Sequence, residues 1–102
     1  MPEYRRIASR QDLPKIGQAQ EFALGDKIVC IANVDGNVSA MDNICGHRGG
    51  PLGQGTVEAG KVVCPWHGWH WDPVTGASSE RSDVAVAIYP IKIEGDDVFV
   101  MI

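Results

Sequence analysis

The sequence predicts an all-β fold, and three observations lead to that prediction. Short apolar runs alternate with clusters of Gly, Pro, Asn and Asp along the whole chain, which is the pattern of short strands joined by tight turns. The tripeptide Asp35-Gly36-Asn37 lies between two apolar runs, as in a two-residue β-hairpin. No segment keeps a helical apolar period for longer than about three turns. A chain of 102 residues can bury one core, so we expect a single domain over 1–102.

The expected strands follow from the turn residues that separate them. In the first part of the chain they are predicted at 4–8, 20–24, 27–34 and 38–41, with a turn or a single helical turn at 12–17. A short hairpin through Ala59-Gly60 is predicted to join 56–58 to 61–64. The remaining strands are predicted at 69–72, 84–87, 89–94 and 98–102.

Two short loops each combine one cysteine with one histidine. Cys45 and His47 are two residues apart, and Cys64 and His67 are three residues apart. Two thiolates and two imidazoles suit either a tetrahedral zinc ion or an iron–sulfur cluster. A zinc finger usually pairs Cys with Cys and His with His, whereas each loop here mixes the two ligand types. The glycine-rich stretch 46–55 lets backbone N–H groups approach a cluster closely.

The two loops resemble the motif of the Rieske [2Fe–2S] family. Further motif positions that match are Gly49 and Leu52 after the first pair, and Gly68 and Trp69 after the second. The resemblance implies one [2Fe–2S] cluster per chain, with two cysteines on one iron and two histidines on the other. By the same resemblance, Cys45, His47, Cys64 and His67 are the ligands. It also implies an antiparallel β-sandwich or barrel base, with a small cluster-binding lobe at approximately 43–76.

Several functional classes are not expected. Terminal Rieske oxygenases carry a further domain with a mononuclear iron held by two histidines and a carboxylate. Only His70 remains here besides the proposed ligands, and we expect it to be a surface or packing histidine, so no catalytic residue is assigned. The net charge of −4 without a basic stripe argues against nucleic acid. No apolar run reaches the roughly 18 residues that a membrane helix needs.

Cysteine usage favours a reducing, cytoplasmic location. Respiratory Rieske proteins typically add a disulfide between the cluster loops, and neither loop here has the additional cysteine. Cys30 lies in an apolar run and is expected to be a small core residue.

Two tryptophans bear on the reduction potential. High-potential Rieske proteins resemble one another in having hydroxyl residues where this chain has Trp69 and Trp71. Without those hydroxyl donors, we expect a potential near the low end of the Rieske range, about −150 mV. We expect both rings to shield the cluster from water.

The resemblance implies a Rieske-type ferredoxin, which is an electron carrier and not an enzyme. Its expected partners are an NAD(P)H-dependent flavin reductase and a terminal oxygenase, docking near Arg48, Pro51 and Trp66. An alternative is the small subunit of an assimilatory NAD(P)H nitrite reductase, which has the same fold and would bind a larger enzyme subunit. A structural zinc module is a weaker alternative.

Overall fold

The fold consists of two antiparallel sheets in a computed structural model, which describes residues 3–45, 49–66, 68–81 and 83–102. The larger sheet has the strand order β7-β6-β5-β2-β3-β4-β8, and the smaller has the order β1-β10-β9. The strands are β1 (Tyr4–Ser9), β2 (Gln18–Leu24), β3 (Lys27–Val34), β4 (Asn37–Asp42), β5 (Thr56–Glu58), β6 (Lys61–Val63), β7 (His70–Trp71), β8 (Ile88–Tyr89), β9 (Ile91–Glu94) and β10 (Asp97–Met101). The all-β prediction is confirmed.

The meander predicted for the first part of the chain is present as β2, β3 and β4. Strand β2 pairs with β3 from Gln18↔Asn33 to Leu24↔Lys27, and β3 pairs with β4 as far as Val34↔Asn37. The predicted hairpin turn has φ 54° at Asp35 and 93° at Gly36. Two successive positive φ angles are what a tight hairpin turn requires, which is why Asp-Gly stands there.

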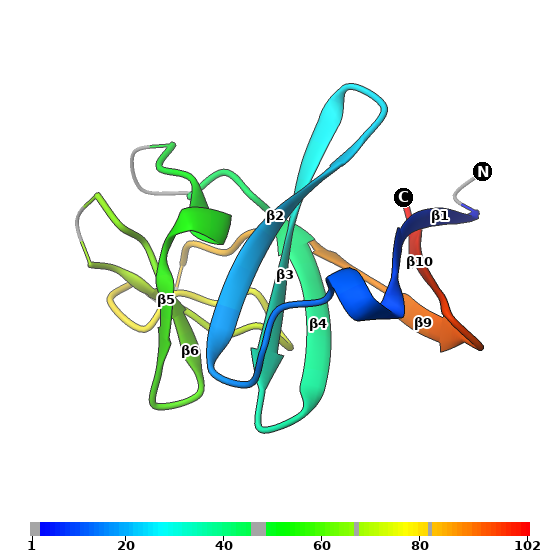
Figure 1. The fold of residues 1–102 in the computed structure, drawn as a ribbon. Helices are drawn as coiled ribbons and strands as arrows, with labels where there is room; N and C mark the ends of the chain where they lie inside the picture. Colours follow the sequence, from blue (N-terminus) through cyan, green and yellow to red (C-terminus); the bar gives the residue numbers. More distant parts are fainter. Residues whose placement is uncertain (1–2, 46–48, 67, 82) are drawn as a thin grey trace.

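Strand β3 is buried on both faces and separates two cores. Val29 and Ile31 pack with Val100 of the smaller sheet, whereas Cys30 and Ala32 pack toward the second half of the chain. Alternate residues of a strand point to opposite faces, so a continuous apolar run serves both cores. Figure 1 shows β5 and β6 on one side of β2–β4 and the smaller sheet on the other. The first core, around Val29 and Ile31, packs the smaller sheet against the larger one. The second core, around Cys30 and Ala32, surrounds the candidate site.

Two strand predictions in the last third were wrong. The strand expected at 89–94 breaks at Pro90 into β8 and β9, which belong to different sheets. Proline has no N–H to donate, so it stands where the chain leaves one ladder and enters another. No strand forms at 84–87, where one bridge joins Ala77 to Ala85 and the other backbone hydrogen bonds run to loop residues and to Asp42 at the end of β4.

The helical segments of the described chain are two 3₁₀ turns, η1 (Arg10–Asp12) and η2 (Leu52–Gln54). Neither described segment is a helix that could cross a bilayer. The turn η1 lies within the stretch 12–17 only at its last residue, so the single turn of helix begins earlier than predicted. The turn η2 lies directly after the first ligand loop.

Candidate metal centre

The first loop is closed by hydrogen bonds at its two ends. The Cys45 N–H donates to the Gly50 carbonyl over 2.8 Å, and the Gly49 N–H donates to the Cys45 carbonyl over 2.8 Å. Gly49 has φ 78°, in the left-handed region that residues with a Cβ avoid. Glycine four residues after the cysteine therefore lets the chain turn back on itself.

The second loop has the same closure. The Cys64 N–H donates to the Trp69 carbonyl over 2.9 Å, and the Gly68 N–H donates to the Cys64 carbonyl over 3.0 Å. Gly68 has φ 73° and again lies four residues after the cysteine. The two cysteines thus begin equivalent loops, although the histidines are spaced differently within them. Sequence analysis noted these glycines as motif positions but not their shared spacing from the cysteines.

A third loop, which begins at Asp72, is closed by the same two backbone hydrogen bonds. The Gly76 N–H donates to the Asp72 carbonyl over 2.7 Å, and the Asp72 N–H donates to the Ala77 carbonyl over 2.9 Å. The Asp72 carboxylate accepts from the N–H of Val74 at 2.8 Å and of Thr75 at 3.1 Å. The Val74 hydrogen bond is the largest cause that lowers the pKa of Asp72. The N–H groups of this loop therefore stabilise negative charge on Asp72.

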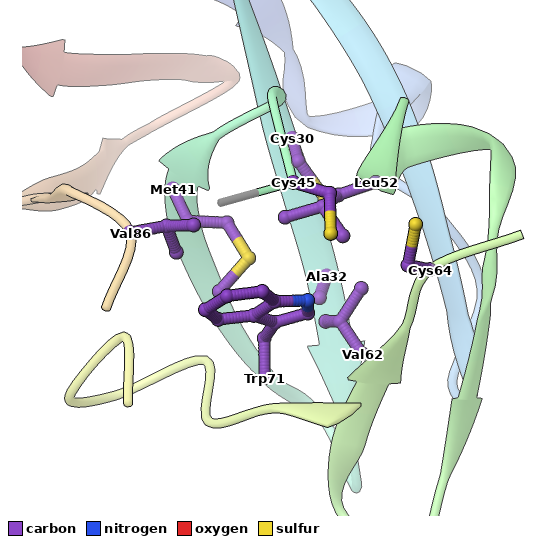
Figure 2. Close-up of a cluster of buried hydrophobic side chains, with 9 residues drawn as sticks. All are labelled: Cys30, Ala32, Met41, Cys45, Leu52, Val62, Cys64, Trp71 and Val86. Atoms are coloured by element: carbon purple, nitrogen blue, oxygen red, sulfur yellow. The ribbon is translucent and has the colours of Figure 1, made fainter. Parts of the chain in front are cut away.

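The structure brings Cys45 and Cys64 into one buried cluster. Each side chain is only 2% exposed, and both pack with Leu52, Val62 and Trp71. Figure 2 shows the two cysteines beside Leu52, with Trp71 on the same side of the sheet. The loops also touch, because a Cβ built on Gly50 would lie 2.7 Å from the Cys64 Sγ. Glycine is thus required where the first loop passes the second cysteine.

The other two predicted ligands, His47 and His67, lie outside the described residues, as does Arg48 of the predicted docking rim. Within the described ranges no three His, Cys, Asp or Glu side chains form a metal-binding group. Two buried thiols in touching loops nevertheless fit an iron–sulfur cluster. The buried Nε1 of Trp71 has no hydrogen-bond partner among the described residues, which fits a site that contains a further acceptor.

Asn43 ties the base of the first loop to β2, a contact that sequence analysis did not predict. Its Nδ2 donates to the Glu21 Oε2 over 2.6 Å, and its Oδ1 accepts from the Gly53 N–H over 2.7 Å. The Asn43 carbonyl accepts from the Leu52 N–H over 2.7 Å. Asn43 is 5% exposed, so these bonds form in the interior. The only sequence signal was an asparagine at the point where the strand pattern changes to the glycine-rich loop.

We expect Asn43→Ala to lower the free energy of unfolding by about 2 kcal/mol, because it leaves a buried N–H of Gly53 without its acceptor. Asn33→Ala is the matched control. Asn33 makes two similar bonds, to the Pro14 carbonyl and from the Gly36 N–H, at a more exposed site. Urea unfolding of both variants measures the difference, and an equal or smaller loss in Asn43→Ala would contradict the anchoring role.

His70, on strand β7, pairs with Glu80. The ring Nδ1 lies 2.8 Å from the Glu80 Oε2, and the His70 N–H donates to the Glu80 Oε1 over 2.7 Å. Burial, the largest influence, raises the pKa of Glu80, but the bonds from His70 together outweigh it, and the pKa lies below its usual value. The His70 side chain is 38% exposed, which is compatible with the surface or packing histidine expected from the sequence, and that role stays a prediction.

Cys30 is fully buried on β3, which confirms its prediction as a core residue. Burial, reinforced by the charge of Glu21, raises the pKa of its thiol to about 12. Cys30 lies inside a strand whose backbone pairs with β2 at Glu21 and with β4 at Met41, and not in a ligand loop. We therefore interpret it as a structural residue, although it lies in the same cluster as Cys45 and Cys64.

Apolar side chains are exposed beside the two loops. Trp66 is 58% exposed and Ile44 is 61% exposed. Pro51, of intermediate exposure, forms a β-bridge with Ile44 across the base of the first loop. We call Ile44, Pro51 and Trp66 the apolar rim. Pro51 and Trp66 were predicted as docking residues, whereas the sequence analysis made no prediction for Ile44.

A model of the Rieske [2Fe–2S] domain matches residues 3–90. The chain belongs to the Rieske family. Membership implies a [2Fe–2S] cluster, in agreement with two cysteines brought together in equivalent loops.

Sequence relatives share this Rieske domain as part of much longer proteins. The oxygenase component of 3-ketosteroid-9-alpha-monooxygenase from Mycobacterium tuberculosis is 43% identical over 49 residues, which is 48% of this chain and 13% of the relative. Human apoptosis-inducing factor 3 is 33% identical over 85 residues, which is 82% of this chain and 14% of the relative. The chain therefore spans about a seventh or less of these curated relatives.

Solved structures match the Rieske domain over nearly its full length. A ferredoxin from Sphingomonas yanoikuyae B1 has a TM-score of 0.85 at 27% identity, covering 97% of this chain and 98% of that one. The ferredoxin of carbazole 1,9a-dioxygenase from Nocardioides aromaticivorans IC177 has a TM-score of 0.83 at 26% identity, with 95% of both chains covered. A putative NADH-dependent nitrite reductase small subunit from M. tuberculosis has a TM-score of 0.84 at 19% identity, covering 99% and 96%, which is a likeness of fold alone. The predicted Rieske ferredoxin fold is thus confirmed.

Proposed function

We propose that this chain is a Rieske-type ferredoxin, an electron carrier that takes single electrons from an NAD(P)H-dependent flavin reductase and passes them to a terminal oxygenase. The observation that carries the proposal is the match to ferredoxins over 95–98% of their own length. The match to a curated oxygenase component, by contrast, covers 13% of that relative. In such a system the Rieske domain carries electrons and a separate protein performs the chemistry.

We propose one cluster per chain, held by Cys45, His47, Cys64 and His67, in a lobe at about 43–76 of a single domain over 1–102. Bound there, a [2Fe–2S] cluster accepts and releases one electron at a time. The two cysteine loops supply thiolates in a site from which water is excluded, and Trp69 packs against the same cluster of side chains. No disulfide joins the cysteines among the described residues, which supports a reducing, cytoplasmic compartment.

The apolar rim of Ile44, Pro51 and Trp66, together with Arg48, is the proposed docking site for redox partners. A small apolar surface next to a redox centre suits short-lived encounters, which bury little area. A solved complex of oxygenase and ferredoxin from carbazole 1,9a-dioxygenase contains a ferredoxin of the same fold, with a TM-score of 0.82 at 20% identity. That complex supports an oxygenase as the class of partner.

A nitrite reductase small subunit is the second candidate, favoured by the fold match of 0.84 in TM-score. Many such subunits lack the cluster ligands by the family resemblance, and this chain retains all four residues. Stable co-purification with a sirohaem enzyme, in place of transient oxidation by an oxygenase, would identify this alternative.

The first test is the electron paramagnetic resonance spectrum of the dithionite-reduced protein, with its midpoint potential and metal content. We expect a Rieske signal, two irons per chain and a potential near about −150 mV. If the protein contains zinc and shows no Rieske signal, the structural zinc module is favoured and the electron-carrier proposal is wrong. With a signal present, reduction by a flavin reductase and reoxidation by a terminal oxygenase complete the test.

A further inference from the structure

The ring of Trp71 is the largest side chain of the second core, and its polar atom is unsatisfied. Trp71 is 0% exposed, and its Nε1 has no hydrogen-bond partner in the described structure. A buried donor without an acceptor costs folding free energy, and such groups are rare in native proteins. An unpartnered N–H inside a core therefore indicates an acceptor that is part of the functional protein.

The surroundings of the ring limit what this acceptor can be. The side chains packed with Trp71 are apolar except for sulfur atoms, and the members of this cluster are Cys30, Ala32, Met41, Cys45, Leu52, Val62, Cys64 and Val86. Figure 2 shows the ring nitrogen on the edge facing Val62 and Cys64, away from Met41 and Val86. The sulfur of Cys30 is a weak hydrogen-bond acceptor, as thiol sulfurs are. The described side chains of this cluster thus offer no good acceptor except the sulfur atoms of the two loop cysteines.

We propose that the Trp71 Nε1–H donates a hydrogen bond to a sulfur atom of the bound cluster and thereby raises the reduction potential. This inference rests on the proposed function, because it requires a [2Fe–2S] cluster between the two cysteine loops. Reduction adds negative charge to the cluster, and a hydrogen bond to a charged acceptor is stronger than one to a less charged acceptor. The donor therefore stabilises the reduced state more than the oxidised one. Trp71 then acts as a hydrogen-bond donor as well as a shield, at a position where high-potential Rieske proteins have a hydroxyl residue.

Trp71→Phe tests the proposal because it keeps an aromatic ring in the core and removes the N–H. We expect the equilibrium constant for reduction to fall about fivefold, which is about 40 mV at about 59 mV per factor of ten, with the Rieske signal retained. Met41→Leu is the matched control, since it changes packing in the same cluster at similar volume and removes no donor. Its potential is expected to stay within the error of the unaltered protein.

A second measurement does not depend on the folding of that variant. The double variant Trp66→Phe with Trp69→Phe, grown with ¹⁵N-indole tryptophan, carries the label at Trp71 alone. Pulsed electron paramagnetic resonance of its reduced form is expected to show a ¹⁵N coupling, and an exchangeable proton coupling that is lost in D₂O. A Rieske signal without these couplings, or Trp71→Phe with an unchanged potential, overturns the inference while the carrier function stands. Absence of any Rieske signal in the unaltered protein overturns both.

Discussion

Replacing Cys64 with alanine is expected to abolish the Rieske signal, and Cys45→Ala is expected to do the same. Each change removes a thiolate from a buried site where water cannot substitute for it, since both positions are 2% exposed. The loops remain closed by backbone bonds that do not involve the sulfur. Iron content and the electron paramagnetic resonance spectrum of the purified variants measure the result. A variant that keeps the signal would remove that cysteine from the ligand set.

Cys30→Ala is the matched control for these two variants. Cys30 is the same residue type, is equally buried and belongs to the same cluster of side chains. Cys30 lies inside strand β3 and outside the two ligand loops. We expect Cys30→Ala to retain iron and the Rieske signal and to lose about 1 kcal/mol of stability from packing. Loss of the signal in this variant would show that general disruption of the core, not ligation, explains the cysteine results.

Among the variants proposed here, Gly76→Ala is expected to lower the free energy of unfolding most, by about 4 kcal/mol. Gly76 has φ 80°, and a Cβ built there would overlap the carbonyl oxygen of Val86. The Gly76 carbonyl also accepts the Val86 N–H over 2.9 Å, so the two backbone segments cannot separate without losing a bond. Gly76 closes the loop that begins at Asp72, next to Trp71, so part of the damage will reach the candidate site.

Gly95→Ala is the control for that prediction. Gly95 also has a positive φ, 58°, but a Cβ built there meets nothing within 4 Å. We expect this variant to lose about 1 kcal/mol, which is the cost of the left-handed backbone alone. Urea unfolding of both variants isolates the contribution of the close backbone approach. Equal losses would show that backbone conformation alone requires the glycine at position 76.

The sequence predicted the strands wherever local chemistry decides them. The meander of β2, β3 and β4 was found because its apolar runs and the Asp35-Gly36 turn have a local pattern. The break at Pro90 was missed because both halves, 88–89 and 91–94, look like strand. Strand β8 joins the larger sheet through Ala40 and Met41, which are distant in the sequence, whereas β9 pairs with the adjacent strand β10. A local residue pattern does not predict which distant strand a segment will pair with.

The sequence by itself determined the residue types and spacing that predict a Rieske site, and the family match agrees with that prediction. Ligand chemistry can be recognised from spacing because a metal needs a small set of donors on short loops. Only the tertiary structure decided that Cys45 and Cys64 share one buried cluster. It also revealed the Asn43 anchor and the unpartnered nitrogen of Trp71. Burial and hydrogen-bond satisfaction depend on which distant segments meet, and folding alone brings those segments together.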